Sequence, residues 1–275
     1  MSSDYTVRLA AQRRFVPLRG LDYHVLSWGD LSLATPEQPA LLLLHGWMDV
    51  AASFQFVVDA LQDTPLAGRP LLAPDWRGFG LTRSPASPDC FWFPDYLADL
   101  DALLDALLPG QTIDLLGHSM GGNIAMIYAG VRPQRIRRLV NLEGFGMPQS
   151  SAAQAPGRYE RWLDELKTAQ PLRSYASAAE VAARLQQNNP LLPADKAAWL
   201  SRHWAAPDAD GRWHLLADAA HKRINPALYR KDEALACWRR ISAPVLWVEG
   251  DRTDVSKWWG QSYPRSDFEE RIAQV

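Results

Sequence analysis

Features that mark whole classes of proteins are scarce in this sequence. Its 275 residues include only two cysteines, Cys90 and Cys237, which lie far apart and without metal-ligand spacing. We therefore expect free thiols and neither a disulfide nor a metal site. No apolar run is long enough to span a bilayer, and the first residues lack the continuous apolar region of a signal peptide. The sequence accordingly predicts a cytoplasmic protein without a membrane segment.

An excess of charge of one sign is also lacking. The formal net charge is -2, with 47% hydrophobic and 22% charged residues, which is an ordinary globular composition. Without a basic stripe, we expect no nucleic-acid partner, and no part of the sequence predicts a cofactor. The length suits one large domain or a core with an insertion, and composition alone does not predict an oligomeric state.

The most informative stretch is residues 111–131. Residues 112–116 are compatible with a β-strand and have the length of a strand buried on both faces, and residues 122–131 are apolar nearly all round, as in a buried helix. Between them stands Gly117-His118-Ser119-Met120-Gly121, a G-x-S-x-G motif. In a strand–turn–helix setting this motif predicts a nucleophile elbow, in which a tight turn lifts the serine hydroxyl above the sheet edge.

Alternating elements extend over most of the chain. Residues 14–18 and 23–28 suit a hairpin, and further buried strands are predicted at 40–44, 70–74, 138–142 and 244–249, with helices between them. This alternation predicts an α/β protein with a mostly parallel, doubly wound sheet.

The pattern changes after residue 146. Residues 147–225 contain no strand-like run, and helices are predicted at 159–169, 178–187 and 194–205. We therefore expect a core formed by residues 1–146 and 226–275, with residues 147–225 inserted as a helical cap.

Polar residues follow the predicted strands at the edge where ligands bind in open α/β sheets. His45-Gly46 follows one strand, Glu143 another, and Gly250-Asp251 a third. The loop Asp75-Trp76-Arg77-Gly78-Phe79-Gly80 follows a fourth, and its aspartate and arginine are expected to fix that loop in place.

These motifs together resemble the α/β-hydrolase family over essentially the whole chain. The matching features are a His-Gly loop, D-x-R-G-x-G, G-H-S-M-G-G, and a strand ending in G-D. The segments HGWMDVAASF and NLEGFG are most similar to the serine hydrolase-like branch with a helical cap.

The resemblance implies a role for individual residues. Ser119 corresponds to the nucleophile, and the backbone N–H groups of Trp47 and Met120 correspond to the oxyanion hole. Asp251 is the expected acid, with Glu143 as the alternative.

Three further residues are expected on the substrate side of the site. His45 belongs to the oxyanion loop, His118 fills the elbow, and these two with Phe145 are the predicted substrate-binding residues.

The chain departs from the family pattern at the residue that serves as the catalytic base. In the family the catalytic histidine follows the acid by one more strand, whereas all six histidines here precede Asp251. A replacement base from His203, His214 or His221 is disfavoured, because a base must stay within hydrogen-bond reach of the nucleophile. The last strand and the helix that covers it are likewise expected to be missing, which would leave the strand at 244–249 as an exposed edge.

Two functions fit these observations. One is a serine hydrolase acting on a carboxylic ester or a related acyl or C–C bond, in a chain truncated before its histidine. The other is a catalytically silent hydrolase-fold protein that binds a small apolar ligand. In the first, the substrate is a small molecule, and an apolar ester is expected. A serine at position 119 argues against haloalkane or epoxide chemistry, for which the resemblance would require an elbow aspartate.

Overall fold

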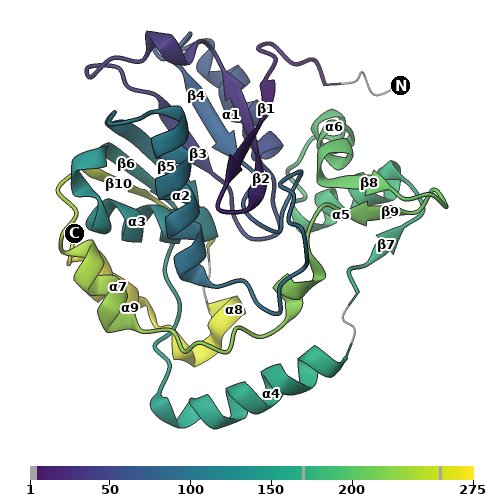
Figure 1. Cartoon of the computed structure of the whole chain (residues 1–275), viewed down its shortest axis with the longest axis vertical. Helices are drawn as coiled ribbons and strands as arrows, with labels where there is room; N and C mark the ends of the chain where they lie inside the picture. The colour runs from purple at the N-terminus through teal and green to yellow at the C-terminus, as the bar shows by residue number, and fades with distance from the viewer. Residues whose placement is uncertain (1–4, 169–170, 254–255) are drawn as a thin grey trace.

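A seven-stranded sheet forms the centre of the protein. The structure is a computed structural model that describes residues 5–168, 171–253 and 256–275. In that part of the chain the strand order is β1-β2-β4-β3-β5-β6-β10 (Figure 1). The strands are β1 (Gln12–Leu18), β2 (Leu21–Trp28), β3 (Leu41–Leu44), β4 (Leu71–Pro74), β5 (Ile113–His118), β6 (Ile136–Leu142) and β10 (Val245–Val248).

The predicted mostly parallel, doubly wound sheet is confirmed. β1 and β2 form the antiparallel hairpin, β2 runs antiparallel to β4, and the strands from β4 to β10 are all parallel to their neighbours. The carboxyl ends of β3, β5, β6 and β10 therefore meet at one edge of the sheet.

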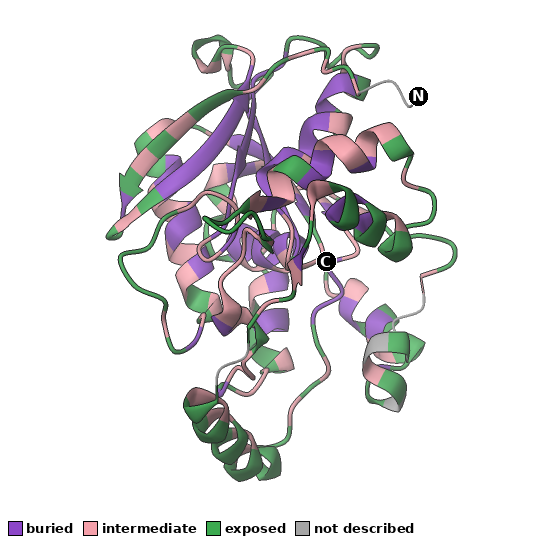
Figure 2. Ribbon diagram, turned by 90° about the vertical axis from the view of Figure 1, so that its right-hand side faces the viewer, coloured by how far each residue is buried: buried purple, intermediate pink, exposed green. Residues whose placement is uncertain are grey.

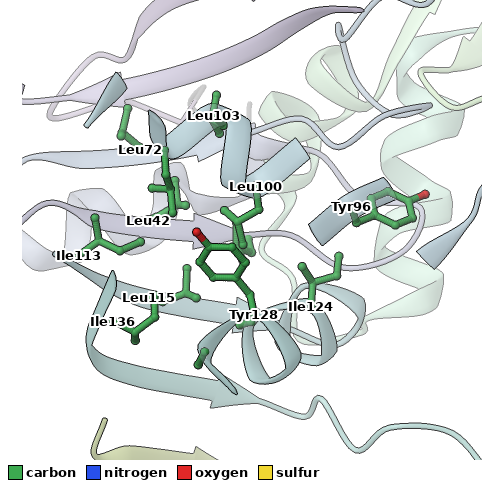
Figure 3. Packing of buried hydrophobic residues seen from close by; sticks show 14 of the residues in the cluster. Leu42, Leu72, Tyr96, Leu100, Leu103, Ile113, Leu115, Ile124, Tyr128 and Ile136 are labelled. Atoms are coloured by element: carbon green, nitrogen blue, oxygen red, sulfur yellow. The ribbon is translucent and has the colours of Figure 1, made fainter. Parts of the chain in front are cut away.

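Helices cover both faces because successive side chains of the buried strands point in opposite directions. Leu42 and Leu44 of β3 pack with α2 (Phe93–Leu107), α3 (Met120–Val131) and α7 (Lys231–Trp238). Figure 3 shows this layer, with Leu100 and Tyr128 facing the strands. Leu41 and Leu43 pack on the other face against α1 (Gln55–Leu61) and the short helix Ala51–Phe54 before it.

The segment between β6 and α7, residues 147–225, is not purely helical, and this corrects the sequence prediction. It contains α4 (Ala155–Lys167), α5 (Ala178–Asn188) and α6 (Ala194–Trp204), and also a three-stranded sheet of β7 (Ser174–Tyr175), β8 (Ala205–Pro207) and β9 (Trp213–Leu215). Strands of two or three residues are too short to leave a periodic sequence signal. Residue 169, the predicted end of the first helix, lies outside the described residues.

α4 is the least buried of these elements. None of its described residues is buried, and it lies apart from the sheet at the bottom of Figures 1 and 2. Arg158 donates to the carbonyl of Asn225 at 2.8 Å, and Glu165 accepts from the N–H of Ile224 at 2.6 Å. Polar contacts to one short segment therefore hold the helix.

Among the described residues, β10 is an edge strand of the sheet. Its Leu246 and Val248 side chains are 58% and 41% exposed, while the face carrying Trp247 packs against α9 (Arg265–Ile272). A shorter helix, α8 (Ser256–Trp259), precedes α9. Arg271 of α9 is fully buried and donates to the carbonyl of Met147, so α9 is anchored where the chain leaves the core for residues 147–225.

Candidate active site

Ser119 stands at the apex of the turn between β5 and α3. Its φ of 51° and ψ of -114° lie outside the regions that ordinary residues favour. The turn is held by backbone hydrogen bonds on both sides, from the Ser119 N–H to the Leu142 carbonyl at 2.8 Å and from the Asn123 N–H to the Ser119 carbonyl at 3.0 Å. A strained non-glycine residue that its surroundings hold this firmly is typical of functional sites.

The glycines around Ser119 are required by close backbone contacts. A Cβ at Gly117 would lie 2.3 Å from the Gly121 carbonyl oxygen, and a Cβ at Gly121 would lie 2.2 Å from that of Leu44. A Cβ at Gly122 would lie 2.4 Å from the Asn141 side-chain oxygen. The motif spacing thus lets α3 start directly against β3 and β5.

The His45-Gly46 loop lies beside the serine. A Cβ at Gly46 would lie 3.3 Å from the Cβ of Ser119 and 3.1 Å from Nδ1 of His118. The N–H of Trp47 follows directly, and the N–H of Met120 belongs to the first turn of α3, where no intrahelical acceptor is available. Both predicted donors are therefore on the backbone segments that border Ser119.

His45 is a buried structural residue of this loop. Its Nε2 accepts from the Trp76 N–H at 2.9 Å, and its Nδ1 lies 2.8 Å from the Gly46 carbonyl, to which it donates in the tautomer that these contacts require. The Trp76 indole also donates to the His45 carbonyl at 3.1 Å. Burial lowers the pKa of His45, so the ring stays neutral. With both nitrogens occupied, His45 positions the loop and does not present a free nitrogen to a substrate.

His118 and Trp47 are exposed at the same edge. Trp47 is 54% exposed, and His118 lies on the solvent-facing side of the elbow. The expected substrate-side position of His118 stays a prediction.

Phe145 packs against the C-terminal region. It is 4% exposed and packs with Tyr263 and Phe268 of the C-terminal region, and its carbonyl accepts a hydrogen bond from the Tyr263 hydroxyl. In the structure described, its contacts are those of a packing residue that holds α9 against the end of β6.

Glu143 links the ends of β6 and β10. Its φ is 54°, and its Oε1 accepts hydrogen bonds from the Gly250 N–H at 2.8 Å and from the Thr253 hydroxyl. The Thr253 N–H closes the turn by donating to the Gly250 carbonyl at 3.1 Å. Asp251 is exposed within this turn. Glu143 therefore holds the loop that carries the predicted acid.

The order of the strands determines how far Ser119 lies from the predicted acid, Asp251. Ser119 follows β5 and Asp251 follows β10, with β6 between them. Strands are about 4.8 Å apart, so the two loops start about 10 Å from each other.

None of the six histidines hydrogen-bonds the Ser119 side chain within the described residues. In addition to His45, three of them have other partners: His24 with Asp75 at 2.7 Å, His214 with Asp208 at 2.7 Å, and His203 stacked on Trp199 at 4.1 Å.

His221 is held between two aromatic rings. It stacks on Phe79 and on Phe91 with ring centroids 3.8 Å apart in each case, and this burial lowers its pKa to about 4. The folded protein therefore disfavours the charged ring. The free energy of unfolding should therefore be unaffected by this group above pH 6.5 and should decrease as the pH drops from 6.5 toward 4. Below pH 4 it should level off, after a total loss of roughly 3 kcal/mol from this group.

Urea unfolding at pH 7 and pH 4.5 tests this expectation. Replacing His221 with phenylalanine keeps a stacking ring without a titrating nitrogen, so the variant should lose less stability than the wild type between the two pH values. Equal losses in the His221 variant and the wild type would contradict the assignment.

The Asp75–Arg77 loop is fixed as expected, although each residue has its own partners. Asp75 accepts from the Ala51 N–H at 2.7 Å and pairs with His24 at 2.7 Å. Arg77 instead pairs with Asp99, at 2.5 Å from Nε. Neither residue faces the serine in a catalytic contact.

Other site types receive no support in the part of the chain that the structure describes. There, no three His, Cys, Asp or Glu side chains gather where they could hold a metal ion. Cys90 and Cys237 are free thiols, as expected. Within the same residues, no helix combines the length and apolarity needed to cross a lipid bilayer.

The fold and the elbow together define an α/β hydrolase. The family model described as the alpha/beta hydrolase fold matches residues 39–270, and the chain belongs to this family. By family it is an esterase-like hydrolase, and such enzymes act on small molecules. The resemblance drawn from the motifs is thereby confirmed.

Individual relatives are similar over different lengths. A serine hydrolase-like protein of Danio rerio is 28% identical over 260 residues, which are 88% of this chain and 72% of the relative. Epoxide hydrolase 2 of Siraitia grosvenorii is 35% identical over 127 residues, 46% of this chain and 37% of that protein. The structure of the thioesterase domain from the curacin biosynthetic pathway superposes with a TM-score of 0.78 at 24% identity, over 96% of this chain and 89% of that domain, which shows the shared fold.

Sequence reasoning missed one contact next to the site. Asp49, four residues after His45, accepts a hydrogen bond from the indole N–H of Trp204 at 3.1 Å. The two residues are 155 positions apart, and no local pattern links them.

Proposed function

We propose that this protein is a serine hydrolase that cleaves an ester, or a related acyl or C–C bond, through an acyl-enzyme on Ser119. The observation that carries the proposal is the strained conformation of Ser119 on a strand–turn–helix elbow beside Gly46. The elbow residue is a serine, which favours acyl chemistry over the epoxide opening named for some relatives. An apolar ester is the proposed substrate, and residues 147–225 are proposed to form the cap over it.

The proposed reaction has two steps. The Ser119 Oγ attacks the acyl carbon, the negative oxygen that forms is held by the N–H groups of Trp47 and Met120, and the leaving group departs with a proton. Water then attacks the acyl-enzyme, which releases the acid and restores the hydroxyl. Asp251 is the proposed orienting acid, and Glu143 is the alternative. In the structure, Glu143 accepts hydrogen bonds from Gly250 and Thr253 and so holds the loop after β10.

The base is proposed to be a histidine outside residues 1–275, as in a shortened form of a working hydrolase. Three observations support this: no described histidine bonds to Ser119, the edge of β10 carries exposed apolar side chains, and His118 is exposed beside the elbow. For residues 1–275 we therefore expect only the residual catalysis that survives loss of a triad member, about 1000- to 10000-fold over water.

The test combines a fluorophosphonate probe, which forms a covalent bond with activated serines, with hydrolysis of p-nitrophenyl acetate. We expect slow formation of a single adduct on Ser119 and weak, measurable ester hydrolysis. Ser119→Ala should remove the adduct, while Ser84→Ala, at an exposed position, should change neither labelling nor hydrolysis. Labelling that survives in Ser119→Ala would contradict the nucleophile. Rapid turnover that depends on Ser119 would place the base within these residues and contradict that part of the proposal.

The second candidate, a silent protein that binds a small apolar ligand, is favoured only by the lack of a described base. It predicts neither adduct nor Ser119-dependent hydrolysis, so the same experiment separates the two.

A further inference from the structure

The loop that carries Trp47 is fastened at both of its ends. At the first end, His45 is buried and bound on three sides by Trp76 and Gly46. At the second end, the Asp49 Oδ1 accepts from the Val50 N–H at 2.8 Å. Three residues, 46–48, span the distance between these anchors.

The second anchor involves the segment 147–225. The indole Nε1 of Trp204, the last residue of α6, donates to Asp49 Oδ1 and also lies 3.1 Å from the Ser53 Oγ. Ser53 in turn donates its hydroxyl hydrogen to Asp49. Asp49 is thus the point where α6, the short helix Ala51–Phe54 and the oxyanion loop are joined.

Of the residues between the anchors, Met48 packs partly buried against the main core, whereas Trp47 is 54% exposed. Met48 has a φ of 56°, a left-handed conformation that is unfavourable for a side chain of its kind. Such strain persists because the surrounding structure holds it, and the contacts at both ends of the loop are part of that structure. The direction of the Trp47 N–H therefore depends on both anchors.

We propose that Trp204 is a positioning residue of the oxyanion hole, acting through Asp49 on the loop that carries the Trp47 N–H. This inference rests on the proposed serine hydrolase function. It gives residues 147–225 a part in catalysis beyond covering the substrate. Trp204 touches neither the substrate nor the reacting atoms.

The expected effect on kcat and KM depends on the step at which negative charge develops on the substrate oxygen. The oxyanion exists in the transition state and the tetrahedral intermediate, and the ground-state ester carbonyl is held far less strongly by the same donors. If the Trp47 N–H is held less firmly in its direction, kcat should fall and KM should stay nearly unchanged. Losing one donor outright costs about 100- to 1000-fold in rate, so a misdirected donor should cost about 10-fold.

Trp204→Phe is the test, because it keeps a large ring and removes the indole N–H. The protein used is the 275-residue chain, in which the oxyanion hole supplies much of the residual rate. We expect kcat for p-nitrophenyl acetate to fall about 10-fold with KM unchanged. The affinity for phenylboronic acid, which forms a tetrahedral adduct with serine, should fall by a similar factor.

A matched control lies one turn earlier in the same helix. Trp199 packs against Phe56 and Tyr5 through its ring, and Trp199→Phe should leave kcat and boronate affinity at their wild-type values. Asp49→Asn keeps an acceptor oxygen for the indole and should retain most of the rate. Asp49→Ala should lose at least as much as Trp204→Phe, and it provides a second route to the answer if Trp204→Phe folds poorly.

The outcomes separate this inference from the function on which it rests. If the fluorophosphonate probe labels Ser119→Ala as fast as the wild type, the proposed function fails. If labelling depends on Ser119 but Trp204→Phe and Asp49→Ala match Trp199→Phe in kcat, only the positioning role is overturned. A rise in KM without a fall in kcat would likewise overturn it, since that change reports substrate binding.

Discussion

Replacing Gly121 with alanine is expected to destabilise the protein by about 3 kcal/mol, near the upper end of the usual cost of overpacking. The added Cβ would lie 2.2 Å from the Leu44 carbonyl oxygen and 2.7 Å from that of His45, both of which are backbone atoms. β3 is buried along its whole length and hydrogen-bonded to strands on both sides, so it cannot move away without losing those bonds. Urea unfolding followed by tryptophan fluorescence measures the loss.

Gly157 offers a matched control for this substitution. It lies in α4, and a Cβ there would meet nothing within 4 Å. Gly157→Ala should therefore stabilise the helix slightly, by up to about 1 kcal/mol, because alanine has the higher helix propensity. Equal effects at the two glycines would show that the contact between α3 and β3 does not constrain the elbow.

Asp99→Ala is the second substitution with a large expected effect, a loss of about 3–5 kcal/mol. Asp99 is fully buried and accepts from Arg77 at 2.5 Å and 2.6 Å, from Arg19 at 2.7 Å and from the Tyr23 hydroxyl at 3.3 Å. Alanine would leave the two guanidinium groups to share Asp95 and would leave the tyrosine hydroxyl without this acceptor.

Asp105 on the same helix is the natural comparison. It pairs with Arg135 at the surface, and its own side chain is 65% exposed. Asp105→Ala should change stability by no more than about 0.5 kcal/mol, as is usual for exposed ion pairs. If Asp99→Ala unfolds at the same urea concentration as Asp105→Ala, the buried ion cluster does not stabilise the loop after β4.

The core strands and the elbow could be predicted because their signals are local. The strands at 40–44 and 70–74 are continuous apolar runs bounded by turn residues, the segment 112–116 leads directly into the elbow motif, and the structure has strands at each. The glycines of the motif permit the close approach of α3 to β3 and β5 that the structure shows. Sequence and tertiary structure agree there, as expected where each local preference supports the fold.

Long-range partners could not be predicted in the same way. Asp75 was expected to fix its loop, yet its partner His24 lies 51 positions earlier, on a different strand. The place of Phe145 after β6 suggests a pocket residue, whereas its neighbours Tyr263 and Phe268 belong to the C-terminal region, more than a hundred residues later. Such contacts depend on how distant elements pack, and no spacing in the chain encodes them.

The exposure of α4 affects which parts of the sequence can change without loss of stability. Because no described residue of this helix is buried, most substitutions there remove neither core volume nor a buried hydrogen bond. Its amides should exchange with solvent long before those of β3, since the helix can open without disturbing the sheet. Sequence drift and insertions between relatives are therefore expected to concentrate in α4, while the edge of the sheet that bears Ser119 stays the same.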